Sequence, residues 1–264
     1  MSEVDQQKSI EERDQELLDN PVDNLDSIIR LNRQEVTPVI VITSQSMEAA
    51  NSQMLHFICS AGRKLDFGDE KEHKYAWEAH VTLQLSGKIL EDCYMGKTPS
   101  HFPMGPQGVL AYQREYFNLL KCLTFIYHYK IRLEDYRGVN QMDYLKEGVR
   151  KSIQYKLNNN RLVATLWDPF LDEGTQSVPC FNWCQLRRLT GNVFRLEILY
   201  RSWDVTAVWS NLAGLIKYFV DEVIVPGGGV LGEVIITGTS THVYRHDFDY
   251  AKAIVGEVNS RRLR

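Results

Sequence analysis

The spacing of hydrophobic positions changes several times along this chain of 264 residues. Alternation with a period of two predicts strands at residues 75–87, 161–167, 178–186, 193–202 and 232–244, and a short buried strand at 37–44. Recurrence every three or four positions predicts helices at 46–65, 108–125, 141–157, 206–224 and 247–258. Two prolines and two glycines predict a loop at 101–108. Together these elements predict a mixed sheet with helices packed on it, which is an α+β fold.

Residues 1–36 differ in composition from the rest, because they hold ten acidic residues against four basic ones. One helix is predicted within them, at residues 10–18, and its hydrophobic face is thin. We therefore expect an acidic N-terminal extension that is either a flexible tail or a capping helix. The folded domain is expected to comprise residues 37–264, a length that one hydrophobic core can serve.

Composition and charge narrow the class of protein. Hydrophobic residues make up 44% of the chain and charged residues 24%, which is typical of a globular domain. The net charge of -4 argues against a binder of nucleic-acid polymers. No hydrophobic run reaches the roughly 20 residues that a membrane-spanning helix needs, and the polar N-terminus does not predict a signal peptide. The five cysteines, an odd number at wide spacings, are expected to be reduced thiols of a cytoplasmic protein.

Three short strings in the sequence carry side chains of the kinds that act in catalysis or bind substrates. The first is Val178-Pro179-Cys180, with Gln185 five residues after the cysteine. The second is Tyr200-Arg201-Ser202-Trp203-Asp204, with Asn211 seven residues after the aspartate. The third is Ser240-Thr241-His242-Val243-Tyr244. Each has a structural explanation when taken alone, because an isolated cysteine is usually a small buried hydrophobe and an isolated histidine a satisfied structural residue.

In this order and at these separations, the strings resemble the signature of the thymidylate synthase family. Tyr129 and Arg132 in YHYKIRL agree with it, as does Asn160-Arg161 leading into Trp167. The resemblance covers about residues 127–246, and the short end after Tyr244 is similar to the compact archaeal-type members. It implies a homodimer that pairs through the sheet and shares its active sites. It also implies transfer of a one-carbon unit from 5,10-methylenetetrahydrofolate to carbon 5 of deoxyuridine monophosphate, without a metal.

The resemblance gives each residue a role, and the chemistry explains the choice. Cys180 would be the nucleophile, because a thiolate that adds to carbon 6 of uracil makes carbon 5 reactive. Arg201 would stabilise the thiolate and, with the Ser202 hydroxyl, hold the nucleotide phosphate, since a guanidinium offers a fork of donors. Arg161 would reach the phosphate bound in the other subunit. The resemblance also places Gln185 among the substrate-binding residues.

The remaining roles concern the uracil ring, the sugar and the folate. Asn211 would bind the uracil edge, because an amide matches a carbonyl beside an N–H group, whereas the cytosine-using members carry an acid there. His242 and Tyr244 would bind the sugar hydroxyl, and alternation along a strand puts them on one face. Asp204 would bind the pterin ring, and Tyr129 would help to remove the proton from carbon 5. Glu115 is the candidate for the glutamate that relays protons through water.

Four departures from the family pattern bear on the pocket. Phe181 stands where many members have His, Tyr200 where they have Gln, and Asn160 where they have a second Arg. The tryptophan-rich insertion of bacterial members is missing between Glu115 and Tyr129. Without an aromatic shield, water reaches the exocyclic methylene before hydride does, and the product is then a 5-hydroxymethyl nucleotide. Trp183 and Trp203 are the candidates for a replacement shield.

Asn211 favours uracil, and the resemblance implies that methylation is the common task of uracil-binding members. Methylation is therefore the leading hypothesis, and three alternatives stay open. One is a 5-hydroxymethylase of deoxyuridylate or uridylate. Another is a catalytically idle relative that binds a nucleotide or a partner protein. The third is a zinc site made of two cysteines and two histidines (Cys180, Cys184, His242 and His246). The two pairs lie 58 residues apart, whereas structural zinc sites usually close short loops.

Overall fold

The structure is a computed structural model, and it describes residues 36–44, 46–66, 75–100, 102–103, 105–117, 129–174 and 178–262. The predicted acidic extension, apart from Val36, lies outside these residues, and so does its helix at 10–18. The second half of the helix predicted at 108–125 also lies outside them. None of the helices in the described part is long and hydrophobic enough to cross a membrane.

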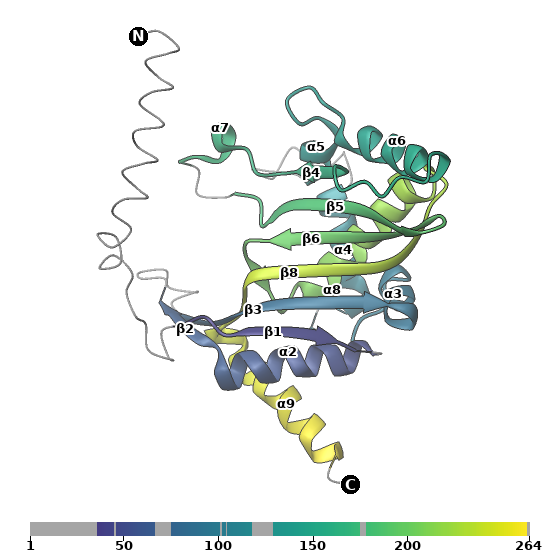
Figure 1. The fold of residues 1–264 in the computed structure, drawn as a ribbon. Helices are drawn as coiled ribbons and strands as arrows, with labels where there is room; N and C mark the ends of the chain where they lie inside the picture. Colours follow the sequence, from purple (N-terminus) through teal and green to yellow (C-terminus); the bar gives the residue numbers. More distant parts are fainter. Residues whose placement is uncertain are drawn as a thin grey trace, which may run out of the picture. The chain divides into compact units, whose positions relative to one another are not determined.

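Eight strands of the described chain form one mixed sheet (Figure 1). They are β1 (Val39–Thr43), β2 (Arg63–Asp66), β3 (Tyr75–Ser86), β4 (Val163–Thr165), β5 (Phe181–Thr190), β6 (Val193–Tyr200), β7 (Trp203–Asp204) and β8 (Val230–Tyr244). The order across the sheet is β1-β3-β8-β6-β5-β4, with β2 paired to β3 and β7 paired to β8. The pairs β1–β3 and β6–β8 are parallel, whereas β3–β8, β5–β6 and β4–β5 are antiparallel.

The helices of the described chain cover one face and the ends of this sheet. The α-helices are α2 (Met47–Ala61), α3 (Gly87–Tyr94), α4 (Gly105–Phe117), α5 (Tyr129–Glu134), α6 (Gln141–Gln154), α7 (Pro169–Asp172), α8 (Val208–Phe219) and α9 (Phe248–Arg262). A π-helical turn, η3 (Val220–Ile224), continues α8, and a 3-10 turn, η4 (Arg245–Asp247), precedes α9. Figure 1 shows α4 and α8 behind the strands. The Trp209 side chain of α8 donates a buried hydrogen bond of 3.0 Å to Asn51 of α2. The helices and the mixed sheet confirm the predicted α+β class.

Two of the predicted boundaries that are wrong lie at glycine. The helix predicted at 46–65 ends at Ala61, because Gly62 is extended and residues 63–66 leave to pair with β3. A Cβ atom at position 62 would lie 2.3 Å from the carbonyl oxygen of Ile58, so only glycine fits there. The loop predicted at 101–108 ends early, because α4 begins at Gly105 with Pro106 in its first turn, where its missing N–H costs nothing.

The short elements α3, α5, α7 and β7 were not predicted. They span two to eight residues, which is too few for a hydrophobic period to show in the sequence. The strand predicted at 178–186 is also displaced, since β5 begins at Phe181 and leaves Cys180 just outside the strand. Cys180 therefore lies just before the first residue of β5.

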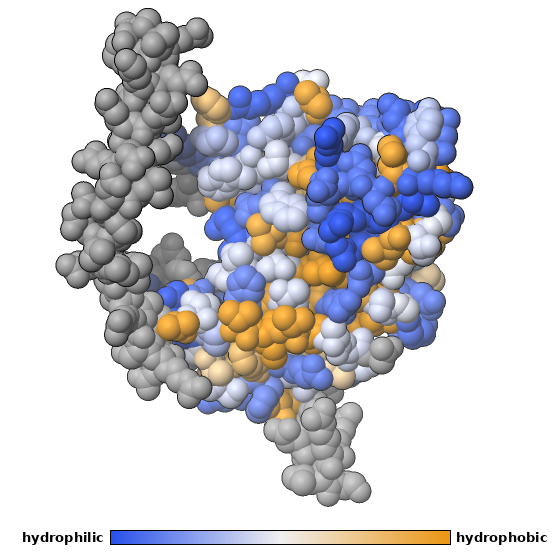
Figure 2. All heavy atoms as spheres, viewed as in Figure 1, coloured by the Kyte–Doolittle hydropathy of each residue, from blue (hydrophilic) through white to orange (hydrophobic). Residues whose placement is uncertain are grey.

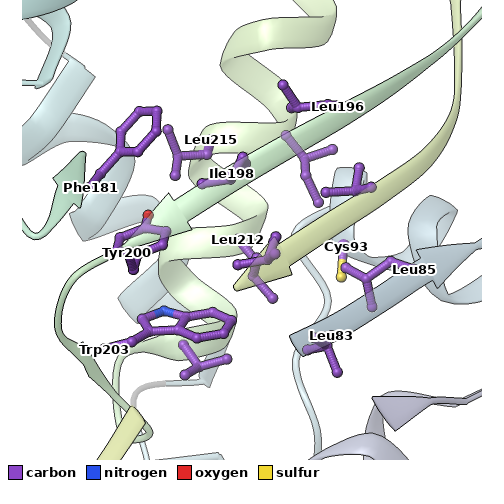
Figure 3. Packing of buried hydrophobic residues seen from close by; sticks show 14 of the residues in the cluster. Leu83, Leu85, Cys93, Phe181, Leu196, Ile198, Tyr200, Trp203, Leu212 and Leu215 are labelled. Carbon is purple, nitrogen blue, oxygen red and sulfur yellow. The ribbon is translucent and has the colours of Figure 1, made fainter. Parts of the chain in front are cut away.

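Alternate residues of the central strands build the core. In β6, Phe194, Leu196, Ile198 and Tyr200 are buried, and the residues between them are half-exposed. Leu212 and Leu215 of α8 pack against this row, as Figure 3 shows. Each large hydrophobic side chain that is fully buried contributes about 1.5–3 kcal/mol to folding. The core therefore fixes the register of β6, which ends just before Arg201, and of β8, which carries His242 and Tyr244.

The opposite face of the sheet has a ladder of polar pairs. Thr82 and Thr237 join their hydroxyls at 3.1 Å, and Gln84 donates to Glu233. At the edge of this face, Val39 and Val41 of β1 are 64% and 66% exposed. Figure 2 shows hydrophobic side chains gathered over the middle and lower strands of this view. We call the face of the sheet that carries Thr82, Thr237, Val39 and Val41 the open face.

An ion pair between α5 and α7 holds the segment that leads towards β5. The Arg132 guanidinium donates to both carboxylate oxygens of Asp172, at 2.6 and 3.2 Å, and to the carbonyl of Leu166 at 3.2 Å. The Gln141 amide bonds the backbone of Arg132 and Thr165 beside it. Both charged side chains are largely buried, so each depends on the other for compensation of its charge.

Replacing Arg132 with leucine should therefore destabilise the fold strongly. The change leaves the Asp172 carboxylate buried without its cation, which costs about 3–5 kcal/mol. Arg150→Leu is the matched control, because Arg150 makes a similar two-bond pair with Glu147 on the exposed face of α6. The measurement is urea unfolding followed by circular dichroism. Equal urea midpoints for the two variants would contradict this account of the Arg132 pair.

Candidate active site

Cys180 lies one residue before β5, where a backbone hydrogen bond joins β5 to the end of β6. The Arg201 N–H donates to the carbonyl oxygen of Cys180 at 2.8 Å. The Arg201 guanidinium then turns back over the segment before the cysteine. Its Nε donates to the carbonyl of Pro179 at 3.1 Å, and its Nη2 donates to the carbonyl of Val178 at 2.9 Å.

The same guanidinium faces the cysteine sulfur. Its Nη2 lies 3.9 Å from Sγ of Cys180, which is half-buried. A fixed positive charge therefore lies beside this sulfur. Cys180 and Arg201, for which the sequence predicts the roles of nucleophile and cation, are therefore neighbours in the structure.

A row of buried aromatic rings lies beside this pair. Tyr129 meets Phe181 edge to face with ring centroids 5.6 Å apart, and Phe181 meets Tyr200 at 5.6 Å. Tyr200 stacks on Trp203 at 5.4 Å, and Figure 3 shows the rings of this second half of the row. All four side chains are buried. Phe181 and Tyr200, two of the departures from the family pattern, thus fill the core beside the cysteine and the arginine.

Asp204 and His242 are neighbours across the short pair of β7 and β8. The Asp204 carboxylate accepts the backbone N–H of Thr206 at 2.9 Å and its hydroxyl at 2.8 Å. His242 is buried, and its Nδ1 lies 3.0 Å from the carbonyl oxygen of Ser240. The Tyr244 ring packs edge to face against the His242 ring at 4.7 Å. Pairing of β5, β6, β7 and β8 therefore gathers Cys180, Arg201, Asp204 and His242 at one end of the sheet.

Asn211 lies in the first turn of α8, which follows β7 after a turn at Val205–Ala207. Its backbone N–H donates to Ala207, and its side-chain Oδ1 is buried. None of the described residues donates a hydrogen bond to this oxygen. A buried acceptor without a donor is costly, so the site suits a ligand that brings an N–H group. Ser202, half-buried, directly follows Arg201.

Arg161 and Gln185 lie elsewhere. Gln185 is five residues along β5 from Cys180, which corresponds to roughly 16 Å of strand. Its amide donates to the carbonyl of Asn160 at 2.5 Å. Arg161 precedes β4, which pairs with β5 antiparallel at Gln185, so it lies farther still from Cys180 along the sheet. Its side chain is exposed. A single chain therefore does not bring these two residues to the cysteine.

Glu115 lies on α4, and its side chain is outside the described part of the structure, so its role stays a prediction. The structure adds one charged group that the sequence argument missed. Glu78 of β3 is buried directly opposite His242 of β8. An acidic residue inside a mainly hydrophobic strand was the available signal. Across the described residues, no three His, Cys, Asp or Glu side chains are grouped to hold a metal ion.

The other described cysteines differ from Cys180 in their surroundings. Burial raises the pKa of the Cys59 thiol to about 11 and that of the Cys184 thiol to about 12. Burial also raises the pKa of Cys93, which is fully enclosed in the core. These thiols are protonated at neutral pH and are poor nucleophiles.

Comparison with known proteins agrees with this geometry. A search against models of protein families finds no match. A protein of Methanosarcina barkeri named "Putative thymidylate synthase" is 30% identical over 176 residues, which are 65% of this chain and 77% of that protein. Proteins of the same name from Methanopyrus kandleri and Methanococcoides burtonii are 29% and 28% identical, over 69% and 75% of their lengths.

This chain belongs to the thymidylate synthase-like family. The matching proteins are archaeal, in agreement with the archaeal-type resemblance of the sequence. The pair of Cys180 and Arg201 lies at the end of the sheet where the pairing of β6 with β8 ends.

Alkylation should distinguish Cys180 from its buried neighbours. At about pH 8, a thiol of pKa about 12, such as that of Cys184, is a thiolate in about one molecule in ten thousand. We expect iodoacetamide to modify Cys180 at least about a hundredfold faster than Cys184 or Cys93 in the folded protein. Peptide mapping by mass spectrometry at short times measures the three rates. Faster labelling of Cys184 than of Cys180 would contradict the assignment.

Proposed function

We propose that this protein is a thymidylate synthase that transfers a one-carbon unit to carbon 5 of deoxyuridine monophosphate. The observation that carries the proposal is the Arg201 guanidinium fixed 3.9 Å from the Cys180 sulfur. The placement of Asp204 and His242 at the same end of the sheet adds support. Family membership makes this chemistry the first one to test.

Cys180 starts the proposed reaction. Its thiolate adds to carbon 6 of the uracil ring, the ring electrons move to form an enolate, and carbon 5 becomes nucleophilic. Asn211 binds the ring, because its buried Oδ1 accepts the N3–H that uracil supplies and its amide N–H₂ can donate to the adjacent carbonyl. Tyr129 is proposed to help remove the carbon 5 proton. Carbon 5 would bond to the methylene carbon supplied by the folate, and loss of the carbon 5 proton would expel tetrahydrofolate and leave an exocyclic methylene. For methylation, hydride from the folate would reduce this methylene as the Cys180 thiolate is eliminated.

Asp204 is the proposed contact to the folate. Each carboxylate oxygen has two lone-pair sites, and Thr206 occupies one site on each, so the group retains acceptor capacity towards a pterin N–H. The Asp204 side chain is half-buried at the site, which leaves it within reach of a ligand. Methylenetetrahydrofolate would supply the carbon unit and, for methylation, the hydride.

The phosphate site is proposed to need two copies of the chain. Arg161 lies more than roughly 16 Å of strand from Cys180, and this separation supports a role for Arg161 at a nucleotide bound by another copy of the chain. The open face supplies a surface for pairing, since the exposed Val39 and Val41 and the half-exposed Leu199 and Ile235 lie on the sheet without a covering helix. Burial of such side chains against a second copy is favourable. Arg161 of one subunit would then reach the phosphate held by Arg201 of the other.

A 5-hydroxymethylase is the second candidate. Trp203, one of the two candidate shields for the methylene, is fully buried and stacked on Tyr200. Trp183 lies on β5 with Gln185, on the face opposite the buried Cys184. Neither position favours a shield over carbon 5, and water would then compete with hydride.

Replacing Cys180 with serine should abolish turnover. An alkoxide is far less accessible than a thiolate at neutral pH, so tritium release from 5-tritiated deoxyuridylate should fall by about a thousandfold or more. Nucleotide binding, measured by calorimetry, should persist. Cys184→Ala is the matched control and should keep its activity, since Cys184 is buried in the core. Absence of tritium release from folded wild-type protein, with deoxyuridine and uridine nucleotides alike, would favour the idle relative.

Mixed dimers should test the shared site. Arg161→Ala and Cys180→Ser subunits, each inactive alone, should regain up to about a quarter of wild-type activity when mixed, because half of the dimers are then mixed and each has one intact site. Arg150→Ala mixed with Cys180→Ser controls for the loss of an exposed arginine. No gain above the separate variants would argue against a site shared between subunits.

The product should distinguish methylation from hydroxymethylation. We expect methylation, which oxidises the folate to dihydrofolate and raises its characteristic absorbance, whereas hydroxymethylation leaves tetrahydrofolate. One reaction followed at that absorbance, with the nucleotide weighed by mass spectrometry, gives both results. A product heavier by one methylene and one oxygen, formed without dihydrofolate, would establish the hydroxymethylase instead.

A further inference from the structure

Glu78 is a buried carboxylate at the end of the sheet that carries His242. It lies on β3, directly opposite His242 of β8, and its side chain is 6% exposed. A buried carboxylate is costly unless donors surround it. Arg63 of β2 supplies two of them, since its Nε lies 3.0 Å from Oε1 and its Nη2 bonds the same oxygen.

The second carboxylate oxygen reaches β8. Ser240 donates its hydroxyl to Oε2 of Glu78 at 2.5 Å. The register of β3 and β8 shifts at this point, because Gly238 pairs with Val81 but Thr241 pairs with Ala79, which leaves one extra residue in β8. Ser240 lies within this bulge. A bulge interrupts the backbone ladder, so side-chain hydrogen bonds support it. Thr239 donates to the carbonyl of Arg201 at 3.0 Å and Thr241 to that of Gly238 at 3.3 Å, and Ser240 is the bulge residue that bonds Glu78.

The backbone of the bulge in turn sets the state of His242. The carbonyl oxygen of Ser240 lies 3.0 Å from Nδ1 of the ring. A carbonyl only accepts, so Nδ1 must carry the proton in this contact. In the neutral ring Nε2 is then the acceptor atom, which is the form that receives a hydrogen bond from a sugar hydroxyl. The chain of contacts runs from Arg63 through Glu78 and Ser240 to His242.

We propose that Glu78 is a positioning residue, which acts through Ser240 to hold His242 as the Nδ1–H tautomer that recognises the nucleotide sugar. The inference rests on the proposed function for the identity of the ligand, but not for the tautomer. Ser240 and Glu78 touch neither the sulfur nor the ring that reacts. Their loss should therefore weaken nucleotide binding and leave the chemical step nearly unchanged.

Ser240→Ala is the sharpest variant, because it removes the link to β8 and keeps the Arg63–Glu78 pair. We expect the KM for deoxyuridylate to rise about tenfold, as for one lost charge-assisted contact, with kcat changed less than about twofold. Ser240→Thr keeps a hydroxyl and should restore the wild-type KM. Asp221→Asn is the matched control, since Asp221 also accepts a hydroxyl bond, from Tyr94, and pairs with a cation, Lys217.

A double variant tests whether Glu78 acts through Ser240. If it does, Glu78→Ala combined with Ser240→Ala should raise KM no further than either single change, because both remove the same link. Additive effects of the two changes would show independent roles and would overturn the proposal. Far-ultraviolet circular dichroism confirms that each variant is folded, and Ser240→Ala alone tests the proposal if Glu78→Ala does not fold.

The tautomer gives a readout that does not depend on catalysis. Nitrogen-15 spectra of histidine-labelled protein, with His242 assigned from a His242→Gln variant, should show the proton on Nδ1 in the wild type. In Ser240→Ala the proton should shift towards Nε2, and Ser240→Thr should restore it. An Nε2–H ring in the wild type would overturn the inference. If the protein instead shows the expected tautomer but neither binds nor converts deoxyuridylate, the proposed function fails and the positioning of His242 stands.

Discussion

The arrangement of the site depends on one side chain, the Arg201 guanidinium. Through Nε and Nη2 it holds the carbonyls of Pro179 and Val178, and so it fixes the backbone that presents Cys180. The same group places a charge beside the sulfur. A guanidinium is a permanent cation in a protein. The group that holds the backbone before Cys180 is therefore also the group that places a positive charge beside the sulfur. A lysine at this position would offer a single charged point and could not bridge two carbonyls while facing the thiol.

The aromatic row explains why two departures from the family pattern occur together. Phe181 and Tyr200 are partners across the β5–β6 pair, and their rings lie 5.6 Å apart in the core. Cross-strand partners contribute to stability as a pair, so a polar residue at one position would leave the other with a poorer contact. Both side chains are fully buried. Their replacement therefore changes the packing behind the cysteine and the arginine, and it does not by itself argue for a different nucleotide.

The sequence predicts the long elements, and it misses what depends on pairing between residues far apart in the chain. The strands at 75–87, 193–202 and 232–244 agree with β3, β6 and β8 because each buries alternate residues against helices. The motif strings single out Cys180 and Arg201, which adjacent strand ends then bring together.

By contrast, the contact between Glu78 and Ser240 joins residues 162 positions apart and depends on a bulge, so no local pattern contains it. The separation of Arg161 from Cys180 likewise follows from the antiparallel pairing of β4 with β5.

Hydrogen-bond capacity gives a reason why Arg201 alone would hold a phosphate weakly. The guanidinium has five N–H donors, and its contacts to the two carbonyls and the sulfur involve the three on Nε and Nη2. Two donors on Nη1 remain for a dianion, which is better compensated by a second cation.

Arg161 is suited to that task from another subunit, because its backbone is braced while its side chain is exposed. Asn159 accepts its N–H and Tyr144 donates to its carbonyl, both at 2.8 Å, and Gln185 holds the preceding carbonyl. An exposed cation on a braced turn loses little backbone entropy on binding. Little of the attraction between Arg161 and the phosphate would therefore be offset at the proposed shared site.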